Sequence, residues 1–127
     1  MAIEPTEKSF VELAAEAAEV RDPVVMVNLL KFAGPDGAAH YQRYVAGVQP
    51  CLEAVGGSLV YAGDVAQTVV GEDDSIQWDA LVVVRYPSRA AFLTMISSPE
   101  YAEVHHHRTA ALETTELIAT NPWMAEN

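Results

Sequence analysis

Hydrophobic residues in the first quarter of the chain change from helical to extended spacing. From Thr6 to about Val20 they recur every three or four residues. One helical face would carry Phe10, Leu13, Ala14 and Ala17. Ser9 and Glu12 have the spacing of a capping box, which predicts the start of this helix. Residues 24–32 are apolar almost throughout and follow Pro23, so they predict a strand.

A second helical stripe follows a Gly-Pro-Asp-Gly turn. Its apolar positions recur at three- and four-residue spacing: Tyr41, Tyr44, Val45, Val48, Leu52 and Val55. Pro50 lies inside this stripe, and we expect it to kink or restart the helix because proline removes a backbone donor. The Gly56-Gly57 pair predicts the end of the helix.

The second half of the chain predicts a hairpin, two short helices and a final strand. Ser58–Val70 reads as a strand with a bulge at Gly63-Asp64, and an acidic loop connects it to a strand at Ile76–Tyr86. Helices follow at about residues 87–96 and from Ser98-Pro99, where serine at the N-cap and proline at the first position favour helix initiation. A last strand is expected from about Thr115 to Thr120.

After the first helix the predicted order is β-α-β-β-α-β, which is the ferredoxin-like arrangement of an α+β domain. We expect a single domain over 1–127, with an N-terminal helix extension at 1–22, a ferredoxin-like core at 23–120 and a tail at 121–127. The strands at 24–30 and 80–84 are apolar on both faces, whereas an antiparallel sheet usually exposes one polar face. A second copy of the same sheet would cover that face and give a two-fold homodimer. The alternative is that the N-terminal helix covers it.

Three stretches carry a family resemblance: VVMVNLLKF, HYQRYVAGVQPCLEAVGG and the long segment from WDALVVVRYPSRAAF to TTELIAT. Over about residues 23–120 the chain resembles domain-of-unknown-function family 1330, in the dimeric α+β barrel superfamily. The resemblance implies a ferredoxin-like fold and a back-to-back dimer. The superfamily includes cofactor-free monooxygenases, lactone isomerases, dehydratases and haem enzymes, so the resemblance assigns no active residues.

Composition excludes several classes of function. The net charge of −11 disfavours nucleic acid and anionic membranes as partners, and no cluster of Lys and Arg offers a local exception. The longest apolar runs are too short to cross a bilayer, and Cys51 is the only cysteine, so we expect a cytoplasmic location. No glycine-rich phosphate loop or dinucleotide fingerprint is present, and we expect no cofactor.

The helix that begins at Pro99 carries the side chains that could most readily take part in a reaction or bind a ligand. Tyr101, Val104, Ala111 and Leu112 form its apolar stripe, and Arg108 falls in the middle of it. A guanidinium in that position must extend to solvent, pair with a carboxylate such as Asp79, or face a wet pocket, where it would hold a carboxylate or enolate oxygen.

His105 and His107 flank the stripe, and either is a chemically reasonable general base. A structural role is the alternative for both. Three consecutive histidines on a helix diverge by about 100° each, so they cannot ligate one metal, and we expect no metal site.

Three further residues are candidates for ligand binding. Asn28 interrupts an apolar strand, Tyr41 sits on a helical stripe facing the sheet, and Trp78 precedes Asp79 at the start of a strand. Because ligand sites are concave and mainly apolar with a few polar groups, we predict a pocket between sheet and helices. The expected lining is Asn28, Tyr41, Asp79, His107 and Arg108, with Trp78 and His105 as further ligand contacts.

These residues leave three functional classes open. The first is a small-molecule-binding homodimer that acts as a cofactor-independent oxygenase, isomerase or lyase on a small organic acid or phenol, with His107, Arg108 and Asp79 as catalytic residues. The second is a non-catalytic dimeric binding or structural module that uses the same polar network. The third is haem binding through a helical histidine, which only the superfamily suggests.

Overall fold

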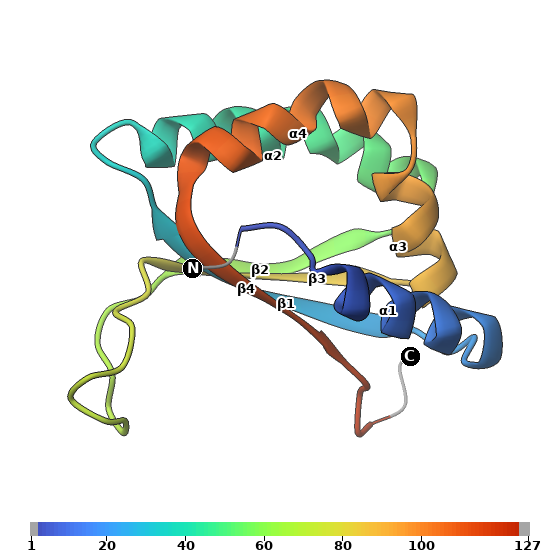
Figure 1. Ribbon diagram of the computed structural model, residues 1–127, viewed down its shortest axis with the longest axis horizontal. Coiled ribbons are helices and arrows are strands. Elements are labelled where there is room, and N and C mark those ends of the chain that lie inside the picture. The colour runs from blue at the N-terminus through green and yellow to red at the C-terminus, as the bar shows by residue number, and fades with distance from the viewer. Residues whose placement is uncertain (1–2, 125–127) are drawn as a thin grey trace.

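A computed structural model describes residues 3–124, in which two helices lie side by side across one face of a four-stranded antiparallel sheet (Figure 1). The strands are β1 (Val24–Phe32), β2 (Ser58–Asp64), β3 (Ala80–Tyr86) and β4 (Leu112–Thr120), in the spatial order β2-β3-β1-β4. The helices are α1 (Glu7–Glu19), α2 (Gly37–Ala54), α3 (Arg89–Ile96) and α4 (Pro99–Ala111). The predicted α+β class and ferredoxin-like strand order are therefore confirmed, with α3 and α4 together forming the second crossover.

Strand β1 shows why the sheet has one packed face. Every second residue from Val24 to Leu30 is buried, and Asn28 takes its place in this row beside Met26. The intervening residues Val25 and Val27 are half-buried and point to the other side of the sheet. The buried row meets α2 and α4 and forms the centre of the core.

The centre of the outer face of the sheet, opposite the helices, is apolar, with Arg85 and Glu116 at its margins. In the sheet register Val27 lies between Val83 of β3 and Ile118 of β4. Leu29 and Leu81 form the adjoining pair on the same face. We define these five residues as the outer-face patch.

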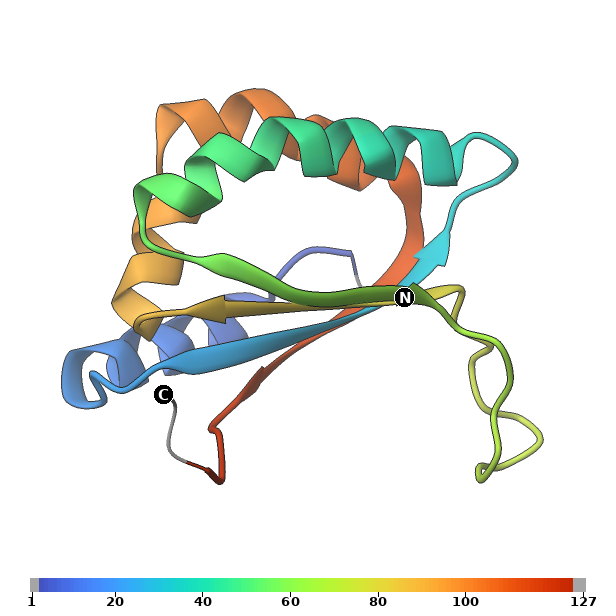
Figure 2. The same cartoon turned by 180° about the vertical axis from the view of Figure 1, so that it is seen from behind.

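Helix α1 does not cover this patch. It lies beside α3 (Figures 1 and 2), and none of its residues is buried. Its residues Phe10 and Leu13 line the cavity on the helix-covered side of the sheet. The alternative in which the N-terminal helix shields the outer face is therefore wrong.

Two predictions about helix ends and proline need correction. The side chain of Thr6, not Ser9, caps α1, because its hydroxyl accepts the Ser9 N–H at 3.0 Å. Helix α2 is one helix that runs through Pro50, which lies near its C-terminal end, so it is not restarted there. Ser88 and Ser98 cap α3 and α4 by accepting the N–H groups of Ala91 and Tyr101.

The predicted hairpin is too long. Strand β2 ends at Asp64 and β3 begins at Ala80, so residues 65–79 form a loop that extends away from the sheet on the side opposite α2 and α4 (Figure 2). The register irregularity lies between Leu59 and Tyr61, not at Gly63-Asp64. The loop is acidic at its centre, and strands continued into it would have no helix to cover their apolar side chains.

The C-terminal strand is longer than predicted, because β4 starts at Leu112 directly after α4. Arg89 at the start of α3 donates from Nη2 to the Asn121 side chain at 2.8 Å, which ties α3 to the end of β4. Only residues 121–124 of the predicted tail are described, and residues 125–127 lie outside the described part of the chain.

Candidate functional site

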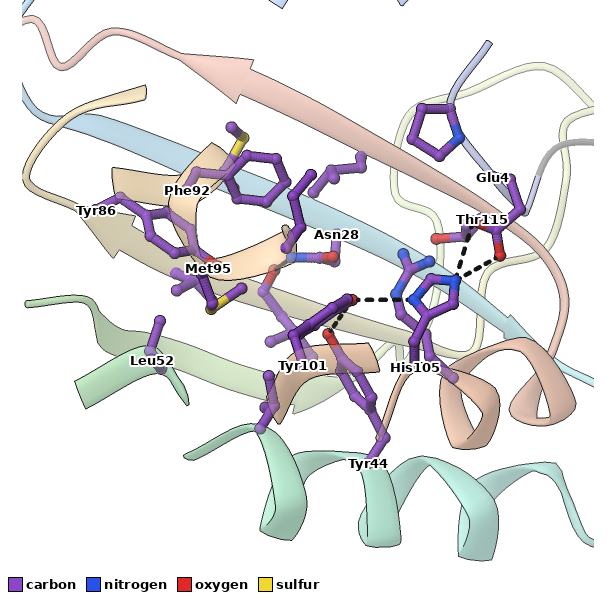
Figure 3. A pocket seen from close by; sticks show the side chains of 18 of the residues that line it. Glu4, Asn28, Tyr44, Leu52, Tyr86, Phe92, Met95, Tyr101, His105 and Thr115 are labelled. Atoms are coloured by element: carbon purple, nitrogen blue, oxygen red, sulfur yellow. Dashed lines mark hydrogen bonds and ion pairs between the residues drawn. The ribbon is translucent and has the colours of Figure 1, made fainter. Parts of the chain in front are cut away.

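A cavity of about 800 Å³ lies between the sheet and helices α2, α3 and α4 (Figure 3). Its apolar wall includes Leu52, Val84, Phe92, Met95, Ile96 and Leu117. Figure 3 shows Leu52, Tyr86, Phe92 and Met95 at one end and Glu4, His105 and Thr115 at the other. The cavity is therefore amphipathic, with its polar groups gathered at one end.

Helix α4 supplies three of these polar groups. Tyr101, His105 and Arg108 are spaced by four and then three residues, which places them on one face of the helix. All three line the cavity. The capped start at Ser98 and Pro99 sets the rotation of this helix, and buried Ala111 continues the same face.

Arg108 is almost enclosed, since only 7% of its surface is exposed. Its Nη1 donates to the main-chain oxygen of Ile3 at 3.2 Å. Within residues 3–124 no carboxylate lies within ion-pairing distance of its guanidinium. Asp79 does not pair with it: that carboxylate accepts the Phe32 N–H at 2.8 Å. A buried cation with no counter-ion from these residues faces the cavity, and such a charge is costly until an anion joins it.

A chain of hydrogen bonds links Tyr44, Tyr101, His105 and Glu4 (Figure 3). The Tyr44 and Tyr101 hydroxyls are 3.0 Å apart, and the Tyr101 hydroxyl lies 3.3 Å from Nδ1 of His105. Nε2 of His105 lies 2.9 and 3.1 Å from the two carboxylate oxygens of Glu4. The carboxylate can only accept, so in a neutral imidazole Nε2 carries the proton and Nδ1 accepts from Tyr101. Tyr44 then donates to Tyr101, and every donor in the chain points toward Glu4.

The buried phenols around Arg108 remain protonated at neutral pH. Burial raises the pKa of Tyr41 to about 12, against a smaller lowering by the Arg108 charge. Burial also raises the pKa values of Tyr44, Tyr86 and Tyr101, while Arg108 lowers each of them. Tyr44 and Tyr101 donate to Tyr101 and His105, whereas the Tyr41 hydroxyl, which makes no hydrogen bond to a described residue, can donate to a bound anion.

The sheet contributes two further polar side chains to the cavity, Asn28 and Thr115. Asn28 donates from Nδ2 to the Val82 carbonyl at 3.1 Å, and Thr115 donates to the Leu29 carbonyl at 2.7 Å. The Asn28 side-chain oxygen makes no hydrogen bond to any described residue. It remains available as an acceptor on the cavity wall.

The structure separates the residues that the sequence grouped together. Asn28, Tyr41, His105 and Arg108 line the cavity, whereas Trp78, Asp79 and His107 do not. Asp79 and Trp78 lie in the loop before β3, and Asp79 holds the end of β1 through Phe32.

His107 lies against its neighbour His106, with ring centroids 4.0 Å apart. Partial desolvation, followed by the nearby His106, Arg43 and His40, lowers its pKa. His107 therefore does not line the cavity with Arg108: adjacent helical residues diverge by about 100°, whereas residues three apart share a face.

The positions of the histidines bear on metal and haem binding. In residues 3–124 no group of three or more His, Cys, Asp or Glu side chains is placed to hold a metal ion. Of the four histidines only His105 lines the cavity, and both of its ring nitrogens are engaged, by Tyr101 and by Glu4. A haem iron in this cavity would have to displace one of these bonds to gain a histidine ligand. No helix in the same residues is long and apolar enough to span a bilayer.

Three site residues were not singled out from the sequence. Glu4 lies before α1, and nothing in its local sequence marks it. Tyr44 and Tyr101 were assigned to apolar helical stripes as packing residues, although the spacing of Tyr101, His105 and Arg108 contains the signal. Both phenols are indeed buried, and their hydroxyls bond to each other.

Comparison with solved structures extends the description of the fold. A protein of unknown function from Rhodopseudomonas palustris is 34% identical, with a TM-score of 0.86 over 98% of both chains. A hydroxynitrile lyase from Passiflora edulis is 14% identical, with a TM-score of 0.63 over 84% of this chain and 100% of its own. A dimeric ferredoxin-like protein of unknown function from Jannaschia sp. CCS1 is 10% identical, with a TM-score of 0.60 over 79% of this chain and 99% of its own. The last two similarities concern the fold alone.

No curated protein is significantly similar to the chain. A family model described as a domain of unknown function, DUF1330, matches residues 33–121, which include α2, α3, α4 and three of the four strands. With this match and the relative from Rhodopseudomonas palustris, the chain belongs to the DUF1330 family.

Proposed function

We propose that the cavity binds a small, partly apolar organic acid or phenol and catalyses proton transfer on it without a cofactor. Arg108 holds the anionic oxygen of the ligand, and the apolar end of the cavity takes its hydrocarbon part. His105 exchanges a proton with the ligand through the Tyr101 hydroxyl. This assignment replaces His107 and Asp79 by His105 and Glu4.

The observation that carries the proposal is the state of Arg108. A guanidinium that is 7% exposed, has no carboxylate partner among residues 3–124 and opens on a mainly apolar cavity requires an anion. A carboxylate or phenolate provides one, and the fork geometry of arginine suits its oxygens. The protonated phenol of Tyr41 adds a neutral donor near the same cation.

The hydrogen-bond chain supports proton transfer as the reaction type. Protonation of His105 at Nδ1 gives an imidazolium beside the Glu4 carboxylate, which stabilises that charge. The proton arrives from Tyr101, whose hydroxyl is in turn restored by a proton from the ligand. Arg108 stabilises the negative charge that develops on the ligand. The hydroxynitrile lyase among the structural neighbours demonstrates a lyase on this type of fold, and it carries no residue assignment to this chain.

We also propose that the chain is a homodimer joined through the outer-face patch. Val27, Leu29, Leu81, Val83 and Ile118 form an apolar surface without a covering helix in the described residues. A second copy presents the same surface and covers it symmetrically. One structural neighbour with a ferredoxin-like fold is described as dimeric, which is consistent with this arrangement.

The experiment uses phenylpyruvate, a small aromatic keto acid with an exchangeable proton next to its carbonyl. Calorimetry measures its binding, and proton NMR in D₂O measures exchange at that carbon. We expect wild type to bind the probe and to accelerate exchange. Arg108→Met should weaken binding roughly 10- to 100-fold, as loss of a charge-assisted hydrogen bond of about 1.5–3 kcal/mol implies. Arg43→Met removes an exposed arginine of α2 and should bind as wild type does.

Tyr101→Phe separates binding from chemistry, because it removes the hydroxyl between His105 and the ligand. We expect binding within a few-fold of wild type and exchange at the buffer rate. Equal affinity in wild type and Arg108→Met would refute the proposed binding mode. Arg108-dependent binding with no accelerated exchange in wild type would instead favour the non-catalytic binding module.

A further inference from the structure

The N-terminal segment Ile3–Thr6, here called the strap, lies against the polar end of the cavity. Ile3, Glu4, Pro5 and Thr6 all line the cavity, on the side where Figure 3 shows Glu4 beside His105. The family model begins at residue 33, so this segment precedes the matched part of the chain. Like β1, the strap lies outside the matched residues, and it reaches the candidate site.

Two consecutive strap residues, Ile3 and Glu4, form hydrogen bonds with residues of α4. The Glu4 carboxylate bonds to Nε2 of His105 and accepts from the Thr109 hydroxyl at 3.1 Å. The Ile3 carbonyl accepts from Nη1 of Arg108. Strap contacts thus reach both side chains to which the proposed function assigns chemistry.

The rest of the N-terminal region holds the strap weakly. No residue of α1 is buried, and the Glu4 side chain is 48% exposed. Elements with few buried apolar contacts open locally at low free-energy cost. The bonds to His105, Thr109 and Arg108 are accordingly the main ties between the strap and α4.

We propose that the strap closes the cavity over its ligand and that Glu4 is a positioning residue, which fixes His105 in the Nε2-protonated tautomer. In that tautomer Nδ1 is a free acceptor for the Tyr101 proton. Without Glu4 the imidazole exchanges between tautomers and loses its orientation. This inference rests on the proposed function for its chemistry, but the Glu4–His105 arrangement can be tested without a ligand.

Nitrogen-15 NMR of the histidine side chains is the first readout, with His105→Gln identifying the resonances of His105. At a pH where the imidazole is neutral, wild type should show the Nε2–H tautomer. Glu4→Ala should convert His105 to a tautomer mixture, whereas Glu4→Gln, which retains an acceptor oxygen, should preserve the wild-type signature. Glu16→Ala, an exposed glutamate of α1, should leave the signature unchanged.

Heteronuclear NOE values of the Glu4 and Thr6 amides report strap mobility. They should fall in Glu4→Ala and fall less in Thr109→Val, which removes only the second donor to the carboxylate. Adding phenylpyruvate should raise them in wild type. Glu4→Ala should lower the exchange rate of the probe about tenfold or more while Arg108-dependent binding changes by a few-fold.

The outcomes separate the two proposals. An unchanged His105 tautomer in Glu4→Ala would overturn the positioning role, whatever the ligand data. Unchanged amide NOE values in the same variant would overturn the proposal that Glu4 holds the strap closed over the cavity. If phenylpyruvate binding does not depend on Arg108, the proposed function fails, while the tautomer result still decides the role of Glu4.

Discussion

Replacing Arg108 by methionine tests whether this buried cation is a structural element of the fold. Methionine has similar length and is flexible, so it should fill the volume of the arginine stem without leaving a large void. The change removes the bond from Nη1 to the Ile3 carbonyl, which as a charge-assisted bond is worth about 1.5–3 kcal/mol. It also removes a nearly enclosed charge with no carboxylate partner in residues 3–124, whose desolvation costs several kcal/mol.

These two contributions oppose each other, and we expect a net change in the free energy of unfolding within about 1 kcal/mol of zero. An arginine paired with a buried acid behaves differently, since its loss strands the partner charge and costs about 3–5 kcal/mol. With a urea m-value of roughly 1.5 kcal/mol per molar, the expected midpoint shift is below about 0.7 M, against about 2 M or more for the paired arginine.

Urea unfolding followed by far-ultraviolet circular dichroism measures this difference, at one fixed protein concentration because dimerisation would shift the midpoint. Arg43→Met, at an exposed site, should change stability by less than about 0.5 kcal/mol. Leu30→Ala, at a fully buried site in β1, should lose about 2–5 kcal/mol and calibrates a core defect. A loss of 3 kcal/mol or more in Arg108→Met would refute the assignment of Arg108 to a ligand.

Two further predictions concern the fold and the assembly. Because burial raises the Tyr41 pKa above its unfolded value of 10.0 to about 12, the stabilisation is present below pH 10 and is lost as pH rises toward 12. Absorbance at 295 nm should then show the buried phenols ionising together with unfolding, and their reversible ionisation near pH 10 with native circular dichroism would contradict this. Sedimentation equilibrium should give a mass of about 27 kDa for wild type, twice that of the 13.7 kDa chain. The α1 surface variant Val11→Glu should give the same mass, whereas the outer-face variant Val83→Glu should give about 14 kDa. A monomeric wild type at micromolar concentration would refute the dimer.

Local sequence signals predicted most elements of the fold. The Ser98-Pro99 start of α4 and the continuous apolar segment of β1 depend on neighbouring residues only, and both match the structure. The hairpin beyond Asp64 failed because alternation indicates an extended chain without showing whether another layer covers it. Residues 65–79 include Val69 and Val70, which are 83% and 92% exposed, so they gain little from strand formation in this chain.

The assignment of the catalytic histidine shows a second limit of prediction from the sequence. His107 was grouped with Arg108 as a catalytic residue, yet adjacent side chains on a helix are separated by about 100°. His105 shares the face of Tyr101 and Arg108 at four- and three-residue spacing, so the helical period alone favours it. Helical periodicity could not predict the residue that pairs with His105. Glu4 lies 101 positions earlier, in a segment without helix or strand periodicity.

The location of Glu4 has a consequence for the role of the core itself. The helices and sheet supply a cation, phenols and an imidazole, but within the described residues the only carboxylate bonded to that imidazole comes from the strap. An imidazole without a carboxylate partner has no fixed tautomer, so the core alone would bind an anion through Arg108 and would transfer a proton poorly. Binding and proton transfer would therefore depend on different parts of the chain: binding on the sheet and helices, and proton transfer on the short strap that precedes them.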